Sequence, residues 1–204
     1  MLGNCTEARK AFEECWNNPA YTQIELDDVD VNRTLSHYTT EEPVHFTREM
    51  LWDMEVKKAW DPGRYIPYVV HEGSAESWGR QCPSVDEEMY IRSSAQKQWL
   101  HPEVYETVYE EVYLNHRDQV VTFLGTKTLQ DRPELTPGQP LFHVQHSVGG
   151  EEDRPLNKWR IVHLTETKDE RLIQYFKRFN NPAMLPGFIK IYIEQDLHIP
   201  LSKK

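Results

Sequence analysis

The sequence predicts a single domain of the α+β class, with N-terminal helices, a central antiparallel meander and C-terminal helices. Three observations lead to this prediction. Apolar residues recur at helical spacing near both ends of the chain, and short runs with alternating apolar residues lie between them. The 204 residues contain no internal repeat and no interdomain linker, and a chain of this length is typical of one domain.

The first predicted element is a helix over residues 6–16. Ala8, Phe12 and Cys15 share one side of that helix, and an Asn-Asn-Pro sequence ends it. A short strand over residues 21–26 is predicted to follow.

A second helix is predicted over residues 46–60. Its apolar residues Phe46, Met50 and Met54 recur every fourth position. Thr47 is a residue type that caps the N-terminus of a helix, and an Asp-Pro-Gly sequence ends the segment.

Residues 64–71 are predicted to form a strand. Ile66, Tyr68 and Val70 alternate with other residues, as the side chains of one strand face do. The strand is predicted despite Pro67, which has no backbone donor for a neighbouring strand.

Residues 102–116 are the most ambiguous segment. A helix would gather three valines and three tyrosines on one face, and the four glutamates of the segment favour a helix. As a strand, the same valines and tyrosines have high β-propensity, and residues 115–118 would form a hairpin turn. We predict the helix and keep the strand as the alternative.

The meander is predicted from three β-rich runs at residues 119–129, 140–148 and 158–165, which we expect to pair antiparallel. A Thr-x-x-Glu capping box at residues 167–170 opens a helix over residues 169–179 that is expected to pack across the meander.

The last predicted element covers residues 184–197. Ile189, Ile193 and Leu197 have helical spacing, whereas Ile189, Ile191 and Ile193 also fit a strand. We predict a helix here.

Charge and composition exclude some partners. The formal net charge of −10 would repel a polyanion, so we expect no nucleic acid partner. No apolar run approaches the roughly 20 residues of a membrane span, so we expect no membrane partner. The first residues lack the basic and apolar regions of a secretory signal, and a cytoplasmic location is the expectation.

Two histidines are the main candidates for chemistry, because histidine titrates near neutral pH. In the run at 140–148, His146 shares a strand face with Phe142 and Val144. In the run at 158–165, His163 shares a face with Trp159. If the two faces belong to one side of the sheet, both imidazoles face one apolar hollow and form an acid–base pair. The alternative is two core histidines with hydrogen-bond partners.

We expect no metal and no other cofactor. His143 and His146 lie three residues apart, and on a strand such positions face opposite sides, so they cannot bind one ion together with His163. The three cysteines include no Cys-x-x-Cys pair, and no glycine-rich nucleotide-binding motif is present.

The sequence therefore predicts a cofactor-independent enzyme of the isomerase, dehydratase or cyclase type. His146 and His163 would transfer protons, and Tyr109 would polarise a substrate oxygen. The small apolar or ring-bearing substrate would contact four further side chains, namely Phe142, Val144, Trp159 and Tyr105. One alternative is a non-catalytic protein-binding or accessory subunit, or a homo-oligomer, and another is a mononuclear metal enzyme.

Overall fold

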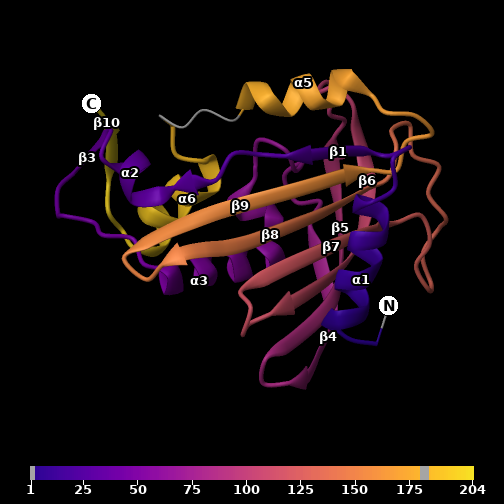
Figure 1. Cartoon of the computed structure of the whole chain (residues 1–204), viewed down its shortest axis with the longest axis horizontal. Helices are drawn as coiled ribbons and strands as arrows, with labels where there is room; N and C mark the ends of the chain where they lie inside the picture. The colour runs from indigo at the N-terminus through magenta and orange to yellow at the C-terminus, as the bar shows by residue number, and fades with distance from the viewer. Residues whose placement is uncertain (1–2, 180–183) are drawn as a thin grey trace.

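A large antiparallel sheet organises the molecule in the computed structural model, which describes residues 3–179 and 184–204. Within these residues the sheet has eight strands, in the order β1-β9-β8-β7-β6-β5-β4, with β2 also paired to β9 (Figure 1). A separate pair joins β3 to β10. The strands are β1 (Thr22–Glu25), β2 (Val29–Asp30), β3 (Tyr38–Thr40), β4 (Glu76–Ser84), β5 (Glu87–Lys97), β6 (Tyr105–Asn115), β7 (Val120–Thr126), β8 (Phe142–Glu151), β9 (Arg154–His163) and β10 (Leu201–Lys203).

Helices lie at both ends of the chain and cover both faces of the sheet. They are α1 (Cys5–Trp16), α2 (Val31–Leu35), α3 (Arg48–Trp60), α4 (Pro62–Tyr65), α5 (Glu170–Phe179) and α6 (Gly187–Ile191), which continues as the π-helix η1 (Tyr192–Asp196). The α+β class with terminal helices and a central antiparallel meander is thus confirmed. None of the helices in the described ranges is long and apolar enough to span a bilayer.

The strand register assigns each side chain to one of the two faces. Directly paired residues share a face, and His146 pairs with both Val121 and Trp159. We call this side of the sheet the α3 face, because Val121 packs in one cluster with Ala59 of α3. The opposite side is the α1 face, where Phe12 of α1 packs with Tyr113.

Helix α3 forms as the sequence predicts, but its buried stripe is only partly the predicted one: Met54 is buried, whereas Met50 is only partly buried. The Thr47 hydroxyl accepts a hydrogen bond from the Met50 backbone N–H and caps the helix. The buried side chains are Leu51, Met54, Glu55, Lys58 and Ala59. A charged pair therefore lies within the buried stripe of the helix.

The helix predicted at 102–116 is wrong, because residues 105–115 form the strand β6. Both faces of β6 are covered, so burial is nearly continuous and hides the alternation typical of a strand. Glu110, which favoured a helix in the sequence, is buried in an ion pair with Arg92 of the neighbouring strand, 2.7 Å away. Valine and tyrosine packing outweighs the helix propensity of the glutamates.

The strand predicted at 64–71 is also wrong. Pro62 begins the short helix α4, and a turn follows it. Only an isolated bridge from Val70 to Gln96 is formed in this segment. Proline fits the first turn of a helix well because its missing N–H would have no partner there.

The remaining elements follow the prediction with small shifts. The three runs of the meander are β7, β8 and β9, and they pair antiparallel. Helix α5 packs on the α3 face, where Leu172 and Phe176 contact Phe142. Asp169, rather than a capping box from residue 167, accepts a hydrogen bond from the Arg171 backbone N–H at its start. Helix α6 with η1 confirms the helix predicted at 184–197.

Candidate functional site

A cluster of ionisable side chains lies between α3 and the sheet, around His146 of β8. The Nδ1 atom of His146 is 3.0 Å from Oε2 of Glu55 and 2.8 Å from Nζ of Lys58. Lys58 Nζ also lies 2.8 Å from Oε1 and 2.7 Å from Oε2 of Glu55. The side chains of Glu55 and Lys58 are 0% and 4% exposed, so this ion pair is sealed from water.

Three further side chains surround this cluster. The amide Nδ2 of Asn157 donates to Oε1 of Glu55 over 2.8 Å. The Trp159 ring stacks on His146, with centroids 4.6 Å apart and an interplanar angle of 6°. Lys58 Nζ lies 3.8 Å from the centroid of the Phe188 ring in α6. We call Glu55, Lys58, His146, Asn157, Trp159 and Phe188 the His146 cluster.

Burial and charge together shift the ionisation of the cluster. Burial, and next the charge of Lys58, lower the pKa of His146 to about 4, so its imidazole is neutral at pH 7. Burial lowers the pKa of Lys58 to about 8 against the opposing effect of Glu55. Burial would raise the pKa of Glu55, but the charges of Lys58 and His146 outweigh it and lower that pKa. At neutral pH the cluster holds one cation, one anion and one neutral imidazole.

The second ring nitrogen of His146, Nε2, has a different environment. It makes no hydrogen bond within the described ranges, and it is not among their fully buried polar atoms that lack a partner. The His146 side chain is 10% exposed, more than its two charged neighbours. Nε2 is therefore the one ring nitrogen of His146 that a bound molecule could engage.

The surroundings of His163 are apolar. Its ring lies 5.5 Å from the Phe142 ring and 5.9 Å from the Phe176 ring. The residue is fully buried, and neither Nδ1 nor Nε2 has a hydrogen-bond partner among the residues that the structure describes. Burial lowers the pKa of His163 to about 3, so the ring is neutral at pH 7. Nearby Trp99, which packs on Phe142 and Phe176, also has a buried N–H that finds no acceptor within residues 3–179 and 184–204.

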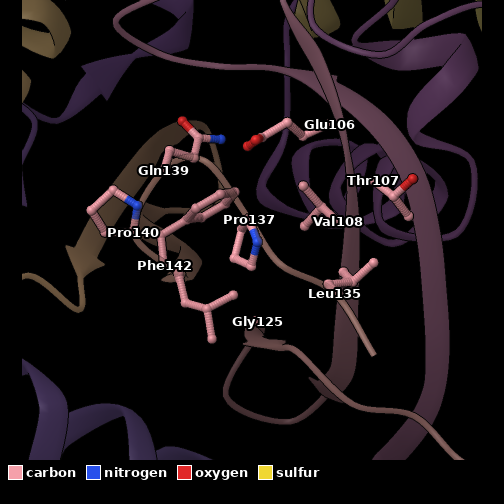
Figure 2. Close-up of a pocket in the computed structure, with 10 residues that line it drawn as sticks. Glu106, Thr107, Val108, Gly125, Leu135, Pro137, Gln139, Pro140 and Phe142 are labelled. Carbon is pink, nitrogen blue, oxygen red and sulfur yellow. The ribbon is translucent and has the colours of Figure 1, made fainter. Parts of the chain in front are cut away.

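A small hollow adjoins Phe142 at this end of the sheet (Figure 2). Its volume is about 10 Å³, which is the room of one water molecule. Figure 2 shows Phe142, Pro137 and Val108 around it, and Glu106 and Gln139 with their side chains directed toward each other. Oε2 of Glu106 is buried and has no hydrogen-bond partner among the described residues, while Oε1 accepts from the Gly138 backbone N–H over 2.5 Å.

A wider groove lies beside the hollow on the surface. It has a volume of about 920 Å³ and shares Pro137, Gln139, Pro140 and Leu141 with the hollow. Its other wall is residues 164–171, which lead from β9 into α5. Neither the groove nor the hollow is lined by His146 or His163.

The structure places the two predicted histidines on one face of the sheet, but in different surroundings. Phe142 pairs with His163, and Trp159 pairs with His146, so the two imidazoles are offset by four positions along β9. At roughly 3.3 Å per residue this corresponds to about 13 Å. Val144, which pairs with Ile161, lies between them. Phe142, Val144 and Trp159 thus share the α3 face with both histidines.

The two predicted tyrosines lie elsewhere. Val112 of β6 faces α3, so Tyr109 and Tyr105, at odd distances from it, face the α1 side. Tyr109 is buried there, and Tyr105 contacts the His71 ring at 5.1 Å near the end of the strand. A tyrosine on the α1 face cannot reach a substrate that contacts His146, which corrects the role expected for Tyr109.

His143 also faces the α1 side, away from His146. Its Nδ1 accepts a hydrogen bond from the Gly125 backbone N–H. Over residues 3–179 and 184–204, no three His, Cys, Asp or Glu side chains are grouped closely enough to hold a metal ion.

Glu55 and Lys58 are the site residues that the sequence prediction missed. Charged residues of a surface helix are normally assigned to its solvated side, and the predicted apolar side used Phe46, Met50 and Met54. A usable signal was present, since Glu55 and Lys58 follow Leu51 at intervals of four and three residues.

No family model matches this chain, and no curated protein matches its sequence. Among solved structures it is similar to the Zhui aromatase/cyclase from Streptomyces sp. R1128, with a TM-score of 0.46 and 8% identity over 78% of this chain and 83% of that one. The 18 kDa protein CC1736 from Caulobacter crescentus has a TM-score of 0.47 and 11% identity over 79% and 97% of the two chains. Dicamba monooxygenase has a TM-score of 0.48 and 12% identity over 91% and 54%.

Proposed function

We propose that this protein is a cofactor-independent enzyme that acts by acid–base chemistry on a small, partly apolar, ring-bearing molecule. His146 is the principal reacting group, and the reaction class is isomerisation, dehydration or cyclisation. The substrate contacts the α3 face, with its apolar part against Phe142, Val144 and Trp159.

The His146 cluster is the observation that carries this proposal. One nitrogen of this imidazole is held by two charged side chains, and the other has no hydrogen-bond partner in the described ranges, which is the arrangement of an oriented proton-transfer group. Its pKa is lowered to about 4, so the ring is neutral at physiological pH. Groups with strongly shifted pKa values and a specific charged partner are concentrated at functional sites.

Stability alone gives little reason for such a cluster. Removing two charges from water costs several kcal/mol for each ion, and well-packed apolar residues of similar volume often replace a buried ion pair at no loss. The neighbouring side chains Ala59, Phe123 and Val144 are apolar, and a second buried ion pair, Arg92 with Glu110, lies next to them on the same face. A buried ion pair in contact with a histidine is therefore more readily explained by a chemical role.

His163, the second imidazole on the α3 face, is proposed to bind the far end of the substrate. Its two unpartnered nitrogens would hydrogen-bond the polar end of a molecule long enough to extend about 13 Å from His146. The ring of Phe142 and the Phe176 ring would supply apolar contacts at that end.

The experiment uses a panel of ring-bearing ketones, enones and phenols, with β-tetralone as the reference compound. Binding is measured by quenching of tryptophan fluorescence, and proton transfer by NMR as exchange of the α-protons of β-tetralone with D₂O. His146→Gln is expected to lower the exchange rate by about 10²–10⁴-fold, as loss of a general acid or base does. His163→Gln tests the second imidazole in the same assay.

His45→Gln is the matched control, because His45 is exposed and lies outside the His146 cluster. It is expected to leave both binding and exchange at the level of the native protein. Binding of no member of the panel, or an exchange rate that His146→Gln leaves unchanged, would contradict the proposed function.

A further inference from the structure

The hydrogen bonds of the His146 cluster determine which ring nitrogen carries the proton. Lys58 has three N–H donors. Nζ lies within hydrogen-bond distance of Glu55 and of His146 Nδ1, and it faces the Phe188 ring at 3.8 Å. Two donors can go to the two oxygens of Glu55, and the lone pair of His146 Nδ1 is then the hydrogen-bond acceptor within reach of the third.

Glu55 does not need a proton from His146. Its Oε1 accepts from Asn157 Nδ2 and from Lys58, and its Oε2 lies 2.7 Å from Lys58 Nζ. Both carboxylate oxygens therefore have donors without the imidazole. A proton on Nδ1 would instead point toward the ammonium of Lys58, which is only 2.8 Å away.

The charge states at neutral pH agree with this assignment. The pKa of Lys58 is lowered by burial but remains at about 8, so the amine is mostly an ammonium at pH 7. The His146 ring is neutral, since its pKa is about 4. A neutral ring that accepts at Nδ1 must carry its single proton on Nε2.

We propose that His146 presents an Nε2–H donor to a carbonyl oxygen, so that the substrates of this site are ring-bearing ketones or aldehydes, and that Lys58 is the positioning residue that selects this tautomer. The inference rests on the proposed function and narrows it. His146 then stabilises negative charge that develops on the carbonyl oxygen. It does so as a neutral hydrogen-bond donor, without first binding a proton.

The first measurement is the tautomer of His146 in the native protein without ligand. Protein labelled with ¹⁵N-histidine is studied by long-range ¹H–¹⁵N NMR correlation at pH 7, which distinguishes a protonated ring nitrogen from a bare one. We expect a bare Nδ1 and a protonated Nε2, in about tenfold or greater excess, because the other tautomer would direct a proton toward the Lys58 ammonium 2.8 Å away. A ring protonated on Nδ1 overturns the inference and leaves the proposed function standing, with a free Nε2 as base.

The second measurement compares two adjacent lysines. Lys58→Met removes the ammonium, and Nδ1–H is then expected to form and donate to Oε2 of Glu55, which is 3.0 Å away. Lys57→Met is the control, because Lys57 pairs with Asp53 of α3 and Asp196 of η1, and among the described residues no hydrogen bond or ion pair joins it to the cluster. An unchanged tautomer in a folded Lys58→Met protein overturns the role of Lys58. If that variant does not fold, the native measurement still decides the tautomer.

The third measurement tests the substrate class with β-tetralone and its alcohol, β-tetralol. The ketone is expected to bind at least about tenfold more tightly than the alcohol and to show a lowered carbonyl stretching frequency in the infrared, as a strong hydrogen-bond donor causes. His146→Phe should abolish both effects. Equal binding of ketone and alcohol, with Nε2–H confirmed, overturns the carbonyl assignment but not the proposed function. Binding of neither compound, nor of any other panel member, counts against the proposed function itself.

Discussion

His146 and His163 stand on the same face of the same sheet, yet their surroundings are opposite. His146 contacts the charged side chains of Glu55 and Lys58 through one nitrogen. His163 is enclosed by Phe142 and Phe176, and neither of its nitrogens has a hydrogen-bond partner in the described part of the chain. Burial lowers the pKa of both rings, so the pKa values alone do not separate them. The two rings differ in their neighbours: His146 has charged hydrogen-bond partners, and His163 has apolar rings around it.

The two histidines have different neighbours because different helices cover them. The helix brings two charged side chains against β8 at His146, whereas α5 brings Leu172 and Phe176 against the sheet near His163. Polar groups buried with their partners are held in one geometry, and those without partners cost free energy until something binds them. The two histidines should therefore respond differently to the same substitution.

The largest expected effect comes from removing the charge of Glu55. Glu55→Gln leaves Lys58 as a buried ammonium without its counter-ion, and removing one partner of a buried pair costs about 3–5 kcal/mol of unfolding free energy. Urea denaturation at pH 7 measures the change.

Asp28→Asn is the matched control for that substitution. Asp28 pairs with Lys158 at 2.8 Å, but both side chains are 42% exposed, so a loss of at most about 1 kcal/mol is expected. Similar losses in the two variants would show that the His146 cluster is no more important for stability than a surface ion pair.

The sequence predicted the strand positions of the two histidines better than it predicted their partners. The face of each histidine follows from alternation along a strand, and the observed register places His146, His163, Phe142 and Trp159 on one side as expected. Alternation is reliable here because the side-chain period of a strand is two residues. The distance between the histidines could not be predicted, because it depends on the pairing of β8 with β9.

The partners of His146 were not predictable in the same way. Charged residues of a helix, such as Glu55 and Lys58, are ordinarily assigned to its solvent-exposed side. Only the packing of α3 on the sheet shows that these two are buried. Strand β5 was missed for a related reason, since Arg92, Ser94 and Gln96 are polar but buried on its α3 face. Predictions of burial from sequence fail at buried polar networks, because they assign polar residues to the surface.

The pH dependence of the unfolding free energy measures how many protons the unfolded chain binds in excess of the folded protein. The unfolded chain protonates a histidine below about pH 6.5, whereas the folded protein protonates His146 only near pH 4 and His163 near pH 3. Between these values protons bind preferentially to the unfolded chain, so the unfolding free energy falls as pH falls from 6.5 toward 4. Each histidine contributes up to about 1.4 kcal/mol per pH unit.

Buried His143, whose pKa is also lowered by burial, adds to the loss in the same direction. Urea denaturation at several pH values measures the slope, and His163→Leu should lower it by one histidine's share. The same slope in native and variant protein would mean that His163 is protonated equally in the folded and unfolded states, against the burial of its ring.

The smallest expected effect is a gain of stability from His163→Leu at pH 7. Leucine has a volume close to that of histidine, and it removes two buried nitrogens that have no partner among the described residues. The desolvation cost of an unpaired polar group is about 1–3 kcal/mol, and part of it is offset by imperfect packing of the new side chain, so we expect a gain of about 1 kcal/mol. His146→Leu, made in parallel, should have the opposite sign, because it leaves an N–H of the Lys58 ammonium unsatisfied. Thermal and urea unfolding of both variants give the two signs directly. A loss in His163→Leu as large as that in His146→Leu would show that His163 has a bound partner, such as a buried water molecule. The two histidines would then differ in the kind of partner they have, and not in whether they have one.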